Sequence, residues 1–278
     1  MIILDVLSLL QAPFIQRAFL IGIIIAVLSS ILSIFIVLKK ISLIGDGLAH
    51  TAFGGLALGY YLSVFPLWIA GITVVLGSIG INKALRSTKI SGDAAVAVFL
   101  QLGLAGGITL LSLARGFGVN LESLLFGSIL IVNTDQIILA AIVAAITLGL
   151  VFVFFKEMVY ITFDETQARA AGIKTWFFDY LLSILAGIVV IVSIPIVGVL
   201  LISALLVLPA LISTQMTKSF RQTVILAPII GLITVVFGIL VSVILDAAPG
   251  GTIVLVGLAI LGIVFISKRA QGIFTGQK

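Results

Sequence analysis

Long apolar runs, separated by short groups of charged residues, proline or glycine, dominate this chain. The runs are continuously apolar over about 20 positions, which is the length that an α-helix needs to cross a membrane. A transmembrane β-barrel would instead alternate apolar and polar residues over about ten positions. We therefore predict an all-α, polytopic membrane bundle with about nine (8–9) transmembrane helices. The predicted spans are 14–38, 43–63, 66–82, 92–113, 136–155, 177–194, 196–216, 222–246 and 250–267.

The composition supports a single transmembrane domain over residues 1–278. The chain is 62% hydrophobic and 9% charged, whereas soluble domains have about 45–50% apolar and about 25% charged residues. No soluble catalytic domain fits beside the predicted spans. The chain has no cysteine, which excludes disulfides and thiolate metal sites. Its single histidine, His50, excludes sites that need several imidazoles from one chain.

The basic residues predict the orientation of the bundle. If the loop with Lys39 and Lys40 is cytoplasmic, strict alternation puts thirteen of the fifteen Lys and Arg residues on the cytoplasmic side. Only Arg17 and Arg115 fall outside. This positive-inside bias predicts an external N-terminus and a cytoplasmic C-terminus. Since the basic residues lie in loops, the net charge of +5 gives no reason to expect nucleic acid as a partner.

Two predicted loops are long enough to contribute to function. The outer loop, at about 114–135, contains the stretch LESLLFGSILIV, which is too short to span and predicts a re-entrant or surface helix. The cytoplasmic loop, at about 156–176, contains DETQARAAG. Acidic residues at the front and glycine at the end are typical of a short capped helix.

Asp46 and His50 are the candidate metal ligands. They lie four residues apart in an apolar run, so in a helix their side chains share one face. Ionisable groups inside a membrane are costly and are functional candidates by default. A carboxylate and an imidazole supply half of a tetrahedral site, and two copies of the chain around a two-fold axis would supply two of each. Glycines at 45, 47, 54, 55 and 59 would let this helix approach a neighbour closely.

Simpler interpretations of the polar residues remain open from the residues alone. Asp46 can cap the N-terminus of its helix, with His50 bonded to a backbone carbonyl. Asp179, beside Trp176 and Tyr180, is most simply an interfacial residue. The glycine clusters match neither a phosphate-binding loop nor a dinucleotide fingerprint, so energy for any active process must come from another chain.

Four sequence blocks resemble a known family, the transmembrane permease subunits of ABC importers for zinc, manganese or iron. SLIGDGLAHTAFGG is similar to its early signature, and DAAVAVFLQLGLAGGITLLSL followed by NLESLLFGSIL is similar to its middle block. FDETQARAAGI resembles its cytoplasmic coupling segment, and DAAPGGTIVL resembles its late turn. The four blocks occur in the family's order and cover nearly the whole chain. Gly47 and Ala49 depart from the family's more varied Ala/Ser pattern, which affects local packing only.

The resemblance implies roles for particular residues. The pore metal ligands fall on Asp46 and His50. The coupling helix that docks on the ATPase falls on the cytoplasmic segment 164–172, from which we name Asp164, Glu165, Ala168, Ala171 and Gly172.

The resemblance also implies partners and a location. Two copies of the permease assemble with two cytoplasmic ATPase subunits and one extracellular or periplasmic metal-binding protein. The complex lies in the bacterial cytoplasmic (inner) membrane, in contact with membrane lipid. The chain itself is then a transport subunit and not an enzyme, which accounts for the absence of a nucleotide-binding motif.

Other functions compete with this interpretation. A permease for metal chelates of the siderophore type would need a wide path and no direct metal ligands. An ion-coupled secondary transporter should have more intramembrane acids and inverted repeats. An intramembrane metalloprotease needs a motif such as HExxH, which one histidine cannot supply. Nitrogen and oxygen ligands suit zinc, manganese or iron, so the sequence does not identify the transported metal. We expect no permanently bound cofactor.

Overall fold

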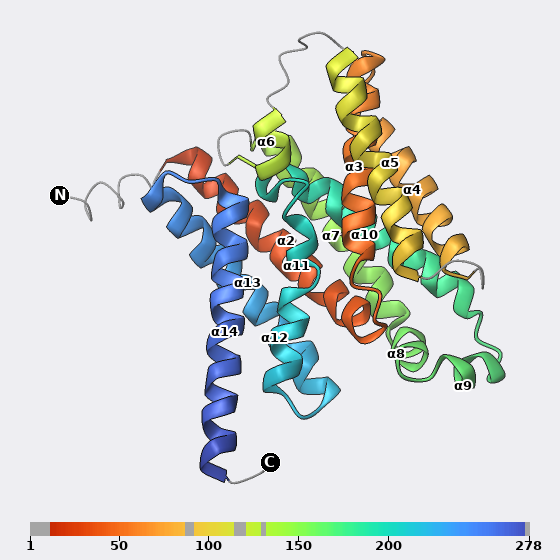
Figure 1. Cartoon of the computed structure of the whole chain (residues 1–278), viewed down its shortest axis with the longest axis vertical. Coiled ribbons are helices and arrows are strands. Elements are labelled where there is room, and N and C mark those ends of the chain that lie inside the picture. The colour runs from red at the N-terminus through yellow and green to blue at the C-terminus, as the bar shows by residue number, and fades with distance from the viewer. Residues whose placement is uncertain (1–11, 87–91, 114–120, 129–131, 276–278) are drawn as a thin grey trace.

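The computed structural model describes residues 12–86, 92–113, 121–128 and 132–275. All regular elements in these ranges are helices (Figure 1). They are α2 (Pro13–Leu38), α3 (Ile44–Tyr61), α4 (Pro66–Leu85), α5 (Gly92–Leu113), α6 (Leu121–Phe126), α7 (Thr134–Val153), α8 (Phe155–Phe163), α9 (Glu165–Ala170), α10 (Thr175–Val197), α11 (Ile202–Leu205), α12 (Leu208–Met216), α13 (Phe220–Leu245) and α14 (Pro249–Thr275). The predicted all-α class is confirmed for this part of the chain.

Seven of the described helices are long and apolar enough to cross a membrane, namely α2, α4, α5, α7, α10, α13 and α14. A multi-pass helical membrane bundle is therefore confirmed. α3, predicted as the span 43–63, is not among the seven. Its sequence contains Asp46, His50 and five glycines, which lower its mean apolarity.

The two sides of the bundle carry different short elements. Figure 1 shows α8, α9, the turn between α12 and α13, and the C-terminal end of α14 on one side. α6 and the N-terminal end of α2 lie on the opposite side. This arrangement agrees with the alternation inferred from the basic residues, which assigns the first side to the cytoplasm. Lys89, Arg115 and Lys278, which contribute to that inference, lie outside the described residues.

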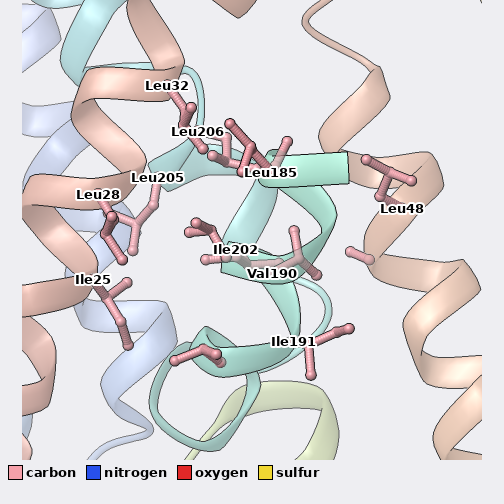
Figure 2. Close-up of a cluster of buried hydrophobic side chains, with 14 of the residues drawn as sticks. Ile25, Leu28, Leu32, Leu48, Leu185, Val190, Ile191, Ile202, Leu205 and Leu206 are labelled. Atoms are coloured by element: carbon pink, nitrogen blue, oxygen red, sulfur yellow. The ribbon is translucent and has the colours of Figure 1, made fainter. Parts of the chain in front are cut away.

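α2 and α10 form the centre of the bundle. Within their apolar windows, 67% of residues in α2 and 72% in α10 are buried, against 17% in α7. Figure 2 shows leucine, isoleucine and valine side chains of α2, α10 and α11 gathered in one cluster, with Leu48 of α3 at its edge. The sparsely buried helices α5 and α7 face outward, where lipid or partner chains supply the remaining contacts.

The predicted span 196–216 is not one continuous helix. α10 continues through Pro195 to Val197, and the chain then turns at Gly198, whose φ is +81°. After this break only the four-residue α11 and the nine-residue α12 follow. Pro195, in the last turn of α10, has no backbone N–H to donate. Glycine adopts a positive φ without strain, so Gly198 can end the helix. The chain in this region is therefore an interrupted segment.

The outer loop packs against the break after α10. The backbone nitrogen of Ser128 donates to the carbonyl oxygen of Pro195 at 2.9 Å. A Cβ at Gly198 would lie 2.3 Å from the carbonyl oxygen of Leu125, so only glycine allows this close approach. The predicted short helix of this loop is present as α6. It is anchored to the end of α10 by backbone hydrogen bonds, while residues 114–120 and 129–131 of the loop lie outside the described part.

Candidate metal site

Asp46 and His50 lie in the first two turns of α3, on one face, as their spacing predicts. Asp46 is half-buried, and His50 is 7% exposed. The Nδ1 atom of His50 is buried without a hydrogen-bond partner among the described residues. A buried polar atom without a partner is unusual in proteins, and a metal ion, a water molecule or a partner chain would each satisfy it. The alternative of a histidine bonded to a backbone carbonyl finds no support at this nitrogen.

α5 packs on α3 at His50 itself. A Cβ at Gly103 of α5 would lie 2.2 Å from the backbone oxygen of His50 and 2.7 Å from the backbone nitrogen of Thr51. The same helix pair meets at Gly54, where a Cβ would lie 3.0 Å from the carbonyl oxygen of Gly103. Glycines on both helices therefore bring the two backbones into direct contact, and this contact fixes the position of the histidine.

α4 closes a second face of α3 in the same way. A Cβ at Gly55 would lie 2.7 Å from the Cα of Ala70, and one at Gly59 would lie 2.6 Å from the Cα of Pro66. Gly55 and Gly59 are two of the five glycines of this helix that were expected to allow close approach to a neighbour. The glycines of α3 thus pack it directly against α4 and α5 of its own chain, in which His50 is buried and Asp46 is half-buried.

The described part of the chain offers two candidate ligands at this site, Asp46 and His50. Among the described residues, no group of three or more His, Cys, Asp and Glu side chains is close enough together to hold a metal ion. A tetrahedral metal site needs about four donor atoms. Asp46 and His50 fit a divalent metal ion by donor type, but a complete shell requires donors from outside the described chain.

The cytoplasmic segment forms the short capped helix that its sequence predicts. Asp164 is the N-cap residue of α9, and its Oδ1 accepts a hydrogen bond from the backbone nitrogen of Gln167 at 2.8 Å. Gly172 follows the end of α9 with φ +84°. Both ends of the helix are therefore fixed by the residue types expected there.

The named residues of α9 point in different directions. Ala168 is fully buried and belongs to the hydrophobic core of the chain itself, so it anchors α9 to the bundle. Ala171 and Gly172 are exposed. Glu165 forms an ion pair with Arg169 one turn later, on the solvent side. The surface of α9 that is available to another protein thus includes Ala171 and Gly172 and excludes Ala168.

Asp179 has a larger role than the interfacial one expected from sequence. Its Oδ1 accepts a hydrogen bond from the Nζ of Lys39, and its Oδ2 lies 2.5 Å from Nη2 of Arg86. Lys39 ends α2 and Arg86 ends α4, so one carboxylate at the start of α10 joins three helix ends. The partners lie 140 and 93 residues away in sequence. The only sequence signal was the cost of a charged residue near an apolar span.

The comparisons with known proteins agree with this arrangement. A model of the family described as the ABC 3 transport family matches residues 11–268. The manganese transport system membrane protein MntC of Listeria monocytogenes is 29% identical over 98% of this chain and 96% of its own length. A probable iron transport system membrane protein of Haemophilus influenzae is 29% identical over 98% of both chains. In the solved structure of PsaBC from Streptococcus pneumoniae in complex with Fab, one chain has a TM-score of 0.85, 29% identity and 95% coverage of both chains.

Proposed function

This chain belongs to the ABC 3 transport family, and we propose that it is the permease subunit of an ATP-driven importer of a divalent transition-metal ion. It is a multi-pass protein of the bacterial cytoplasmic membrane, and it moves its substrate by alternating access. The observation that carries the proposal is the pair Asp46 and His50, a carboxylate and an imidazole on one face of α3, with His50 buried and Asp46 half-buried. The names of the manganese and iron transport relatives support the same substrate class.

Two copies of the chain form the functional unit in this proposal. Each chain supplies one carboxylate and one imidazole, and a two-fold axis would complete an Asp₂His₂ shell. The buried Nδ1 of His50, which has no hydrogen-bond partner in the part of the chain that the structure describes, supports a site that a second chain and the metal complete. The metal is the transported substrate, and Asp46 and His50 hold it while the path is closed on both sides.

The metal to test first is manganese. Carboxylate and imidazole donors accept zinc, manganese and iron, and ligand type does not separate them. The relative MntC is named as a manganese transport protein, whereas the Haemophilus relative is named as a probable iron transport protein. Zinc is the competing metal, because sites of this kind generally bind zinc more strongly than manganese or iron.

We propose nine crossings of the membrane, seven of them by the long apolar helices. α3 is the eighth crossing, because its own chain surrounds it and removes the need for an apolar surface. The interrupted segment of α11 and α12 is the ninth, since irregular backbone is tolerated at membrane depth where protein buries it. An odd number of crossings puts the two termini on opposite sides, and the basic residues predict that the N-terminus is outside and the C-terminus is in the cytoplasm.

The proposed partners are two cytoplasmic ATPase subunits and one extracellular or periplasmic metal-binding protein. α9 is the coupling helix, and its exposed end at Ala171 and Gly172 is the surface that docks on the ATPase. Ala168 holds α9 to the bundle, so a movement of the ATPase would be transmitted to α10, which begins at Thr175.

Uptake of radioactive manganese into cells or proteoliposomes tests the metal site. Asp46→Ala and His50→Ala should reduce uptake to background at equal membrane abundance, because each removes two of the four shared ligands. Asp93→Asn, which changes an exposed carboxylate at the start of α5, is the matched control and should keep wild-type uptake. Wild-type uptake by either alanine variant would refute the assignment of these ligands.

Metal content tests the shared site separately. The purified complex should hold about one ion for two permease chains at this site, after subtraction of the content of an Asp46→Ala complex. One ion for each chain would refute the two-fold site and favour a separate site in each subunit.

The coupling role is tested with two alanines of the same segment. Ala171→Asp places a charge on the exposed end of α9 and should reduce co-purification of the ATPase while the permease keeps its thermal stability. Ala168→Asp buries a charge inside the permease and should lower the stability of the permease itself. Undisturbed co-purification with Ala171→Asp would show that the ATPase docks elsewhere.

A further inference from the structure

An open groove of about 430 Å³ lies between α4 and α10. Apolar and aromatic side chains line it, namely Ile79, Trp176, Phe177, Tyr180, Leu181 and Ile184. Ile79, Trp176 and Phe177 are each more than 40% exposed, so the groove faces the surroundings of the chain. It follows α10 from Trp176 to Ile184, a length of about 12 Å at 1.5 Å per residue. These dimensions and this lining suit the first part of one acyl chain.

The groove starts at the cytoplasmic end of the membrane-spanning region. Trp176 lies in the first turn of α10, directly after the cytoplasmic segment that contains α9. Tryptophan and tyrosine are enriched where the membrane meets water, and here Trp176 and Tyr180 pack edge to face with ring centres 6.3 Å apart. The mouth of the groove therefore lies at the level of the lipid head groups of the inner leaflet.

Cations surround this mouth. Arg86 lies over the ring of Tyr180, with its Cζ 6.0 Å from the ring centre. Lys83, one turn earlier on α4, is exposed and shares a helix face with Ile79 and Arg86. The carboxylate of Asp179 lies near the mouth of the groove, where it forms ion pairs with both Lys39 and Arg86. The side chains around the mouth thus carry an excess of positive charge.

We propose that this groove binds an anionic phospholipid of the cytoplasmic leaflet, with its phosphate at Lys83 and Arg86 and one acyl chain along α10. Basic pockets between membrane helices on the cytoplasmic side suit anionic head groups, because the phosphate neutralises the positive charge that exceeds the single charge of Asp179. A second copy of the chain is the competing occupant. Around a two-fold axis it would bring two copies of the same excess positive charge against each other, which disfavours it. The lipid site does not depend on the identity of the transported metal.

Native mass spectrometry of the intact complex, released from nanodiscs of equal phosphatidylglycerol and phosphatidylcholine, tests the proposal. The wild type should retain phosphatidylglycerol in preference to phosphatidylcholine. Lys83→Gln should reduce this preference about fivefold, the effect of one basic residue near a membrane surface. Lys218→Gln, which removes an exposed cation before α13, is the matched control and should leave the preference unchanged.

A second variant separates the apolar groove from the charges. Ile79→Trp fills the groove with a bulky side chain at an exposed position and leaves every cation in place. It should reduce retention of both lipids. Equal retention of the two lipids by the wild type, or equal effects of Lys83→Gln and Lys218→Gln, would overturn the proposal. Dissociation of the permease dimer by Ile79→Trp, without loss of lipid, would also overturn it and would identify the groove as an interface between copies.

Discussion

Alanine at position 103 should separate α5 from α3 at His50. The added Cβ would lie 2.2 Å from the backbone oxygen of His50 and 2.4 Å from its carbonyl carbon. Carbon and oxygen atoms that are not bonded to each other pack at roughly 3.3 Å or more, so the helices must move apart by about 1 Å. Because the obstructing atoms belong to the backbone, no change of side-chain rotamer relieves the clash. The displaced element is the turn of α3 that carries the candidate ligand.

Gly106, one turn later on α5, is the matched control. A Cβ at Gly106 meets no atom within 4 Å outside its own helix turn. Replacement of glycine by alanine favours a helix by about 1 kcal/mol at either position. The difference between the two variants therefore isolates the clash at Gly103, for which overpacking predicts about 1–3 kcal/mol of destabilisation. Gly103→Ala should unfold at a lower temperature than Gly106→Ala in the same detergent or nanodisc.

Metal uptake should respond more strongly than stability. Metal–ligand distances are fixed to within about 0.2 Å, so a displacement of about 1 Å at His50 disrupts the site. We expect Gly103→Ala to lower manganese uptake at least about tenfold at equal membrane abundance, a loss typical of disturbed support around metal ligands. Gly106→Ala should keep wild-type uptake. Equal uptake and equal unfolding temperatures for the two variants would refute the argument that α5 positions His50.

Three further changes test the cytoplasmic side. Asp179→Asn removes the charge that pairs with Lys39 and Arg86, and thermal unfolding should show a loss of about 1.5–3 kcal/mol. An unchanged unfolding midpoint would contradict a structural role for this carboxylate. Asp164→Ala removes the N-cap of α9, worth about 1 kcal/mol, and faster proteolysis of the segment should report the loosened helix. Gly172→Ala forces a side chain into φ +84° and should loosen the same segment, although space around the residue is open. Proteolysis at the wild-type rate would refute either of these two predictions.

The sequence predicted the features that depend on neighbouring positions. Continuous apolar runs identified the helices, and the acids and glycine of the segment 164–172 identified the capped α9. The spacing of Asp46 and His50 placed both on one face of α3. Each of these inferences uses residues within a few turns of one another, where helix geometry alone fixes the relation.

Features that depend on distant residues could not be predicted in the same way. Asp179 finds one of its partners 140 residues away, and no local pattern specifies which helix ends meet. The interruption after α10 depends on Gly198, whose backbone approaches Leu125 of the outer loop. Ala168 looked like part of a docking surface, but the fold buries it against the bundle. In each case the tertiary arrangement decides the role of the residue.

α3 shows why apolarity is an incomplete guide to membrane-embedded helices. A helix in contact with lipid must be apolar, but a helix surrounded by protein has no such constraint. α3 carries glycines where α4 and α5 approach, and it buries His50 within the chain while Asp46 stays half-buried. The glycines that lower its apolarity therefore also allow the close helix contacts around it. In this bundle, a weakly apolar, glycine-rich helix between strongly apolar ones carries the two candidate metal ligands.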